Sequence, residues 1–289
     1  MSDEIMSRTF RLAMVQMLVE GGRKRENLAR AQSRIIEAAQ AGAQVVLLPE
    51  ALNLGWTHPS AKSEADPIPD GESFQCLRDS ARDCGVYVCA GLVERNGSKI
   101  YNAAVLISPS GELLLHHRKI NELEIGHSFY ALGDKVQTTG TPLATFGLMI
   151  CADAFARGEV ISRSLALMGA DVILSPCAWA VPADHDNQRE PYGQLWRASY
   201  SPIAGDFRTW IAGVSNVGWL TAGPWAGRKC IGCSLLVGPK GEEVLMGPYG
   251  PAADVVLYAE ITPAPRPAQG DGWEDFWKSQ PPSEAVDPA

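Results

Sequence analysis

The stretch that decides the fold runs from residue 145 to residue 153 and has the sequence TFGLMICAD. An apolar run typical of a β-strand ends at Cys151, and small and acidic residues follow it before a helical pattern begins. A thiol in this place lies in the positive field of a helix N-terminus, which favours the thiolate. A buried structural cysteine explains the same pattern. The stretch therefore offers a candidate nucleophile, and the rest of the chain decides between the two interpretations.

Two further strand-like segments also end in charged side chains. Residues 44–48, QVVLL, form a continuous apolar run that ends in Pro49 and Glu50. A hairpin expected over residues 101–117 delivers Lys119 at its end. Ligands of open α/β sheets gather outside the carboxyl ends of strands. Each charged residue has a structural explanation of its own, but together Glu50, Lys119 and Cys151 supply a base, a fixed cation and a thiol.

The remaining patterns predict an α/β chain with mixed sheets. Apolar periodicity indicates helices over residues 25–40, 71–84, 159–168 and 185–200. Further strands are expected over residues 10–18, 86–93, 141–150 (two short strands), 172–176, 209–216, 231–238, 242–246 and 255–261. The second half repeats the helices and mixed sheet of the first, and two such halves pack best sheet against sheet with the helices outside.

Composition excludes several classes of function. The 289 residues include 25 Lys and Arg against 33 Asp and Glu, so the net charge is −8, which disfavours binding to nucleic acid. The acidic N-terminus does not resemble a signal peptide, and no apolar run is long enough to span a bilayer. We therefore expect a cytoplasmic protein that does not bind membranes.

The seven cysteines predict neither a disulfide framework nor a metal site. Their number is odd and their surroundings are apolar. Cys230 and Cys233 have the spacing of half a zinc site, but no second pair or histidine cluster accompanies them. We expect no metal at these cysteines.

The composition changes at Thr262, where prolines become frequent. We predict a single domain over residues 1–261 and a Pro-rich tail over residues 262–289. The tail carries Trp273, Phe276 and Trp277, which are costly to leave in water. We therefore expect it to dock on its own body or on a partner subunit.

Three short motifs resemble the catalytic motifs of the nitrilase, or carbon–nitrogen hydrolase, superfamily. They are LLPE at residues 47–50, HRKI at residues 117–120 and MICAD at residues 149–153, in the family's order. Family-like features follow at residues 175–179 (SPCAW), 214–218 (VSNVG) and 232–241. The resemblance covers residues 10–261.

The resemblance implies a fold, an assembly and a chemistry. The fold is a four-layer αββα sandwich of two mixed sheets with helices outside, and the assembly is a homodimer or a higher homo-oligomer. The chemistry is cofactor-free hydrolysis of a non-peptide C–N bond. By motif, Cys151 is the nucleophile, Glu50 the general base and Lys119 the oxyanion stabiliser, with the backbone N–H of Ala152 as a second donor.

Other roles follow from the resemblance less directly. The family often has a second glutamate before an aromatic-glycine segment; we choose Glu124, with Glu122 as the alternative. We place Trp179 and Asp153, with Ala152, among the substrate-binding residues.

The cysteine, small residue and aspartate at residues 151–153 are similar to the amidase and carbamoylase branches. The family's Phe-Pro-Glu is replaced by Phe155-Ala156-Arg157. We predict hydrolysis of a small amide through a thioester, releasing a carboxylic acid and ammonia.

Several alternatives remain open at this level. The substrate can be an N-carbamoyl amine, an N-carbamoyl amino acid or a nitrile, and an amine can replace water as the acceptor of the acyl group. The protein can also be a binding protein without catalytic activity. A papain-like enzyme would pair Cys151 with a histidine, for which His185 is the candidate. Aromatic residues can line the pocket, among them Trp56, Tyr192, Trp196 and Trp219. Three arginines can bind a substrate carboxylate: Arg157, Arg189 and Arg197.

Overall fold

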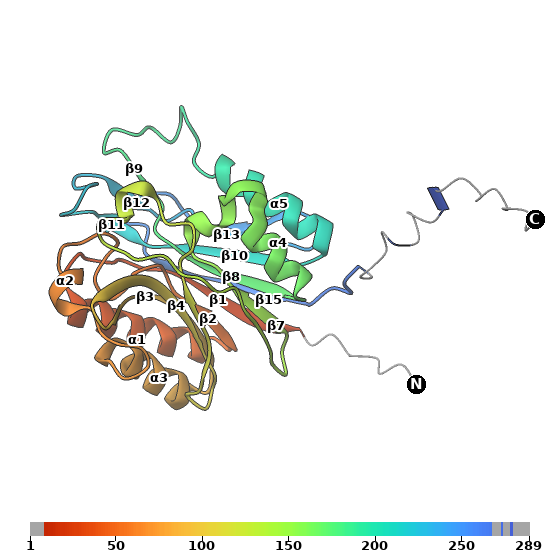
Figure 1. Cartoon of the computed structure of the whole chain (residues 1–289), viewed down its shortest axis with the longest axis horizontal. Helices are drawn as coiled ribbons and strands as arrows, with labels where there is room; N and C mark the ends of the chain where they lie inside the picture. Colours follow the sequence, from red (N-terminus) through yellow and green to blue (C-terminus); the bar gives the residue numbers. More distant parts are fainter. Residues whose placement is uncertain (1–8, 268–272, 274–277, 280–289) are drawn as a thin grey trace, which may run out of the picture.

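The protein is a sandwich of four layers. The computed structural model describes residues 9–267, 273 and 278–279. Helices α1 (Lys24–Gln40) and α3 (Glu72–Cys84) cover the outer face of one sheet. Helices α4 (Val160–Leu167) and α5 (Gln194–Phe207) cover the outer face of the other (Figure 1). The predicted αββα architecture is confirmed.

Each sheet has six strands. The first has the order β15 (Val255–Ile261), β1 (Phe10–Gln16), β2 (Val45–Leu47), β3 (Tyr87–Asn96), β4 (Lys99–Ile107) and β5 (Leu113–Arg118). The second has the order β14 (Glu243–Met246), β13 (Leu235–Val237), β10 (Trp210–Ser215), β8 (Val172–Cys177), β7 (Thr145–Leu148) and β6 (Thr138–Gly140). In each sheet three central strands are parallel and the flanking strands are antiparallel, so both sheets are mixed.

Successive side chains of β1 point to opposite faces of the sheet, and each face packs into a different hydrophobic core. Phe10, Leu12 and Met14 face the core between the sheets, where the Phe10 and Phe146 rings lie 5.9 Å apart. Ala13 and the residues of the same parity face α1 and α3. Strand β1 is therefore buried on both faces, with one set of alternate residues between the sheets and the other set beneath the helices.

Short elements complete the chain. A third sheet of three antiparallel strands is formed by β11 (Val217–Trp219), β12 (Lys229–Ile231) and β9 (Ala180–Val181). The sequence did not predict this sheet, because strands of two or three residues show no period. The single strand expected over residues 231–238 is divided at Gly232 and Cys233, which both have positive φ. Four more short helices are α2 (Ala61–Glu64), η1 (Glu124–Gly126), η2 (Cys151–Phe155) and η3 (Arg157–Glu159).

Helix α5 begins nine residues later than predicted. The expected range was 185–200, whereas α5 spans Gln194–Phe207. Pro191 disfavours helical backbone at the residue before it, and Gly193 has φ +113°. The helix then continues through Pro202 because Ile203 and Ala204 are buried against the second sheet. Residues 182–193 are left as a long connection beside the site.

The first residues of the predicted tail lie against the second sheet and its connections. The indole Nε1 of Trp210 donates to the carbonyl of Thr262 at 2.9 Å, and Arg266 pairs with Asp171 at 3.2 Å. Phe276 and Trp277 lie outside the described residues, so docking of the tail stays a prediction. No helix within the described ranges combines the length and the apolar character needed to cross a bilayer.

Candidate active site

Glu50 and Lys119 form a buried ion pair at the ends of β2 and β5. Lys119 Nζ lies 2.8 Å from Glu50 Oε1, and the two residues are 2% and 1% exposed. Asn102 Nδ2 donates to the same carboxylate oxygen at 2.6 Å. The backbone N–H of Glu50 donates to the carbonyl of Cys177 at 3.2 Å, which joins the two sheets at this end. The pair therefore lies where the sheets meet.

Glu122, the alternative to our choice of Glu124, is the glutamate that lies beside the Glu50–Lys119 pair. Glu122 Oε1 lies 3.3 Å from Lys119 Nζ, and its Oε2 accepts a hydrogen bond from Asn102 at 3.1 Å. Glu124 begins η1 with its side chain exposed, and it makes no ion pair with another described residue. Gly126 leaves room for the Glu122 side chain, because a Cβ atom at residue 126 would lie 2.8 Å from the carboxyl carbon of Glu122.

Burial and charge set the protonation of this cluster. Burial raises the pKa of Glu50, and the negative charge of Glu122 raises it further, while Lys119 acts in the opposite direction. Burial alone would lower the pKa of Lys119, but Glu50 and Glu122 outweigh burial and hold that pKa well above 10.5. Lys119 therefore stays an ammonium ion, and Glu50 is a carboxylate with a strong tendency to take up a proton.

Cys151 lies on a sharp turn at the end of β7 and beside the ion pair. Its φ is +46°, and its N–H donates to Ser175 Oγ at 3.2 Å. Burial raises the pKa of the thiol well above 9.0, as do the Cys177 side chain and the charge of Glu50, while Lys119 partly offsets them. Burial thus opposes the thiolate that the field of the five-residue helix η2 would favour.

Asp153 holds the cysteine turn and the lysine strand together. Its Oδ1 accepts the N–H groups of Ile120 and Asn121 at 3.1 and 2.7 Å. Its Oδ2 accepts the N–H of Ile150 at 2.9 Å and lies 2.8 Å from His117 Nε2. Both oxygens are thus occupied, so the structure does not support our placement of Asp153 among the substrate-binding residues. We expect Asp153 to position the cysteine turn rather than to contact the substrate.

Aromatic side chains pack around the site. Trp179, 2% exposed, stacks on Trp196 with ring centroids 4.5 Å apart, and the Trp196 Nε1 donates to the Tyr192 hydroxyl at 2.9 Å. Trp56 lies 5.9 Å from Lys119 Nζ, measured to the ring centroid. Among the described residues, no hydrogen-bond partner reaches the indole nitrogens of Trp56 and Trp179. Trp219 is 48% exposed and does not share this packing.

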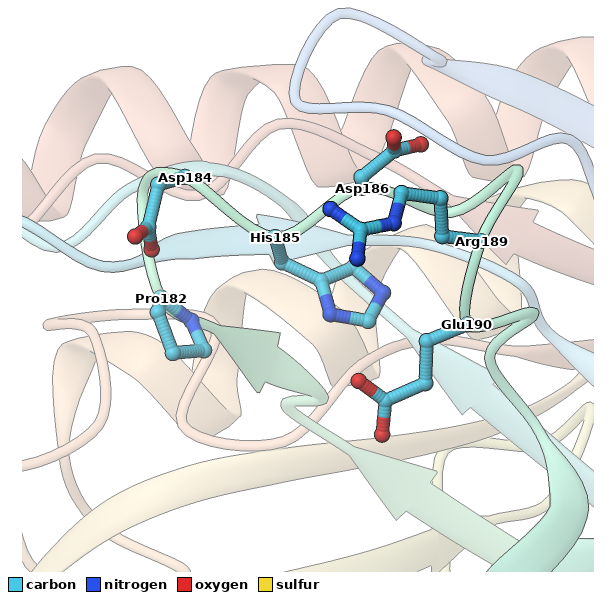
Figure 2. A pocket seen from close by; sticks show the side chains of 6 residues that line it. All are labelled: Pro182, Asp184, His185, Asp186, Arg189 and Glu190. Atoms are coloured by element: carbon cyan, nitrogen blue, oxygen red, sulfur yellow. The ribbon is translucent and has the colours of Figure 1, made fainter.

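A cavity of about 570 Å³ opens beside the connection that precedes α5 (Figure 2). Its lining includes three carboxylates, those of Asp184, Asp186 and Glu190, together with His185 and Arg189. In the view of Figure 2, the guanidinium of Arg189 lies above the His185 ring and the carboxylate of Glu190 lies below it. Carboxylates thus outnumber the arginine in the lining of this cavity.

The three arginines considered from the sequence differ in placement. Arg189 lines the cavity, Arg157 is exposed, and Arg197 pairs with Glu243 at 2.6 Å. The sequence did not point to Arg228, whose guanidinium carbon lies 4.2 Å from the Trp225 ring centroid. Trp225 packs edge-on against Trp56 at 5.0 Å. No ion pair links Arg228 to a carboxylate within the described part of the chain.

Metal-binding geometry is not seen in the described ranges. No three His, Cys, Asp or Glu side chains there are placed to hold one ion. Cys230 and Cys233 are free thiols on either side of the Gly232 turn.

Comparisons with known proteins give the family. The carbon-nitrogen hydrolase family model matches residues 11–265. The chain is 34% identical to a nitrilase of Pyrococcus abyssi, over 82% of this chain and 84% of that protein. It is 33% identical to the omega-amidase NIT2 of Danio rerio, over 75% of this chain and 81% of that protein. The chain therefore belongs to the carbon–nitrogen hydrolase family and is an enzyme of that class.

Solved structures share the fold. An amidase from Nesterenkonia sp. superposes with a TM-score of 0.74 at 20% identity, covering 93% of this chain and 96% of that chain. Nit3 of Saccharomyces cerevisiae superposes with a TM-score of 0.74 at 23% identity, covering 99% of both chains. The two-sheet sandwich is the fold of the nitrilase superfamily.

Proposed function

We propose that the protein hydrolyses a small amide through a thioester on Cys151. One observation carries the proposal: a buried Lys119 is shared by Glu50 and Glu122, and its charge is coupled to the Cys151 thiol. A buried ion pair of this kind is costly to maintain for stability alone. A base, a cation and a thiol in one buried site are what acyl transfer requires.

In the acylation step, Glu50 takes the proton of Cys151 as the sulfur attacks the amide carbon. The raised pKa of Glu50 suits it to this transfer. An ammonium group has three N–H donors, and Lys119 donates one to Glu50 at 2.8 Å and pairs with Glu122 at 3.3 Å, which leaves a donor for the oxyanion. The N–H of Ala152 makes no hydrogen bond within the described residues and supplies a second donor.

The C–N bond then breaks. Protonated Glu50 gives its proton to the leaving nitrogen, and ammonia departs. Glu122 keeps its charge beside Lys119 when Glu50 is neutral, so the ammonium remains paired throughout. In the second half, Glu50 takes a proton from water and the hydroxide attacks the thioester. The C–S bond breaks, Glu50 returns the proton to the Cys151 sulfur, and the carboxylic acid is released.

An ω-amide of a dicarboxylic acid is the favoured substrate. Several relatives that are 31–33% identical are named omega-amidases. Arg228 supplies a half-buried cation without a carboxylate partner in the described residues, and its ring contacts lead through Trp225 to Trp56 beside Lys119.

An N-carbamoyl amine is the second candidate. The carboxylates of Asp184, Asp186 and Glu190 at the cavity favour a cationic substrate end. The two candidates require opposite charges on the substrate.

The test is ammonia release from matched ω-amido acids, uncharged amides, N-carbamoyl amines and nitriles. Wild type and Cys151→Ala are compared, and early samples are examined by intact mass. We expect ammonia from the ω-amido acids, an acyl adduct on wild type, and a loss of about four orders of magnitude with no adduct in the variant. Turnover that survives in Cys151→Ala would exclude the thioester route. Ligand binding with neither ammonia nor an adduct would indicate a binding protein.

A further inference from the structure

A second thiol, Cys177, lies beside Cys151 on the neighbouring strand. Strands β7 and β8 are parallel, with Phe146 opposite Val172 and Leu148 opposite Leu174. The N–H of Met149 donates to the carbonyl of Leu174 at 3.2 Å, so the pairing continues beyond β7. Extending the register by three positions places Cys151 opposite Cys177.

Side-chain contacts agree with this register. Ser175 Oγ accepts the N–H of Cys151 at 3.2 Å and lies 3.4 Å from Cys177 Sγ. Neighbouring strands are about 4.8 Å apart, and disulfides join Cα atoms about 4.4–6.8 Å apart. Two residues directly opposite each other on neighbouring strands are therefore close enough for a disulfide.

The two thiols differ in exposure. Cys151 is 8% exposed and Cys177 is fully buried. A small solvent-borne oxidant therefore reaches Cys151 first. Cys177 Sγ also contacts the Tyr200 hydroxyl at 3.8 Å, which holds it among polar neighbours rather than in a purely apolar core.

The other cysteines lie on other elements. Cys76 and Cys84 belong to α3, Cys89 to β3, Cys230 to β12, and Cys233 follows the Gly232 turn. All seven are free thiols in the structure.

We propose that Cys177 is a resolving thiol for Cys151, so that hydroperoxides convert the pair into a reversible disulfide. The sulfur of Cys151 attacks the terminal peroxide oxygen and the O–O bond breaks, which leaves a sulfenic acid on Cys151 and releases water from hydrogen peroxide or an alcohol from an organic hydroperoxide. The sulfur of Cys177 then attacks that sulfur, the S–O bond breaks, and water leaves. Two thiols are oxidised and one hydroperoxide is reduced.

The disulfide would block the nucleophile and protect it from irreversible oxidation. Only its effect on amide turnover rests on the proposed function; the disulfide itself does not. Because burial raises the pKa of the Cys151 thiol, the reaction is slow at neutral pH and accelerates as the pH rises. A dithiol reductant reverses it by exchange.

The test uses the reduced full-length chain treated with hydrogen peroxide and then alkylated under denaturing conditions. Peptide mapping is expected to show one cross-linked pair, which joins the peptides of Cys151 and Cys177. Its mass should be lower than the summed masses of the two peptides by two hydrogens. Activity is expected to fall about tenfold and to return to within about twofold of the untreated enzyme after dithiothreitol.

Two variants sharpen the result. Cys177→Ser, compared with its own untreated sample, is expected to accumulate sulfinic acid at Cys151 and to stay inactive after dithiothreitol. Cys89→Ser removes a thiol that is equally buried but lies on β3, and it is expected to behave as wild type. Phenylarsine oxide, which bridges adjacent thiols, is expected to add one equivalent to wild type and none to Cys177→Ser or Cys177→Ala.

Absence of the cross-link in peroxide-treated wild type, or a cross-link to another cysteine, would overturn the inference. The inference would also be overturned if both Cys177 variants regained activity after dithiothreitol to the same extent as wild type. If the disulfide forms while no amide is hydrolysed, the thiol pair stands and the proposed function fails. If amides are hydrolysed and no disulfide forms, the proposed function stands and the inference fails.

Discussion

The carboxylate of Asp153 lies 2.8 Å from the Nε2 of His117, two residues before Lys119 in the chain. The same carboxylate binds the N–H groups of Ile120 and Asn121 on one side and Ile150 on the other. One buried side chain therefore fixes the cysteine turn relative to the lysine strand, without facing the substrate itself. The distance between two candidate catalytic groups depends on this contact.

Asp153→Asn tests the role of this link. We expect the free energy of unfolding to fall by about 3 kcal/mol, because an amide cannot accept at both oxygen positions of a buried carboxylate. We expect kcat/KM to fall about hundredfold through displacement of Lys119 and Cys151. Urea unfolding and steady-state kinetics measure the two effects. Asp66→Asn is the control: it removes a part-buried carboxylate paired with Lys24, so stability is expected to fall while kcat/KM stays within about twofold.

The stability difference should also depend on pH. His117 and three backbone N–H groups hold the pKa of Asp153 below 3.8 despite burial, which alone would raise it. A carboxyl with a lowered pKa stabilises the fold above its ordinary pKa and loses that effect as the pH falls through its folded pKa. The gap between wild type and Asp153→Asn should therefore narrow below pH 3.8. A gap that stays constant to lower pH would contradict the assignment.

The pH profile of turnover reports on Glu50. The base must be ionised, and burial raises its pKa above 4.5, so kcat/KM should fall as the pH decreases through a value above that of an exposed glutamate. Glu50→Gln should remove activity at every pH. An acidic limb at or below 4.5 would show that Glu50 is not the titrating base.

Alkylation of Cys151 reports on the thiol. Because its pKa is raised well above 9.0, the rate with iodoacetamide should still be rising at that pH rather than levelling off near neutrality. The rate is followed by peptide mass, with the part-buried Cys84 on α3 as the internal reference. A plateau at neutral pH would show a thiolate and would favour the helix-field interpretation.

Glu122→Gln and Glu124→Gln form a matched pair. Removing the charge of Glu122 leaves Lys119 with one carboxylate, so we expect kcat/KM to fall about tenfold to hundredfold. The exposed Glu124 should tolerate the same change within about twofold. The reverse order of effects would restore the choice made from the sequence.

Arg228→Met tests the proposed carboxylate contact. The methionine keeps an apolar contact with Trp225 and removes the charge. We expect KM for an ω-amido acid to rise about tenfold while KM for an uncharged amide is unchanged. Arg189→Met is the control from the cavity; a larger effect there would place the carboxylate beside His185 instead.

The sequence by itself determined the layers and three of the site residues. Alternation in Phe10, Leu12 and Met14, and the continuous run before Glu50, depend on local periodicity, which survives without knowledge of the fold. Each apolar run also shows where its strand ends. The sequence alone therefore places Glu50, Lys119 and Cys151 at strand ends.

Only the tertiary structure decided which neighbours these residues have. Glu122 rather than Glu124 reaches Lys119 because η1 begins at Glu124 and turns that side chain outward. Burial between the two sheets beside Glu50 raises the pKa of the Cys151 thiol, an effect that no local pattern reveals. Strand register brings Cys177 alongside it, and register is a relation between distant segments rather than a property of either one.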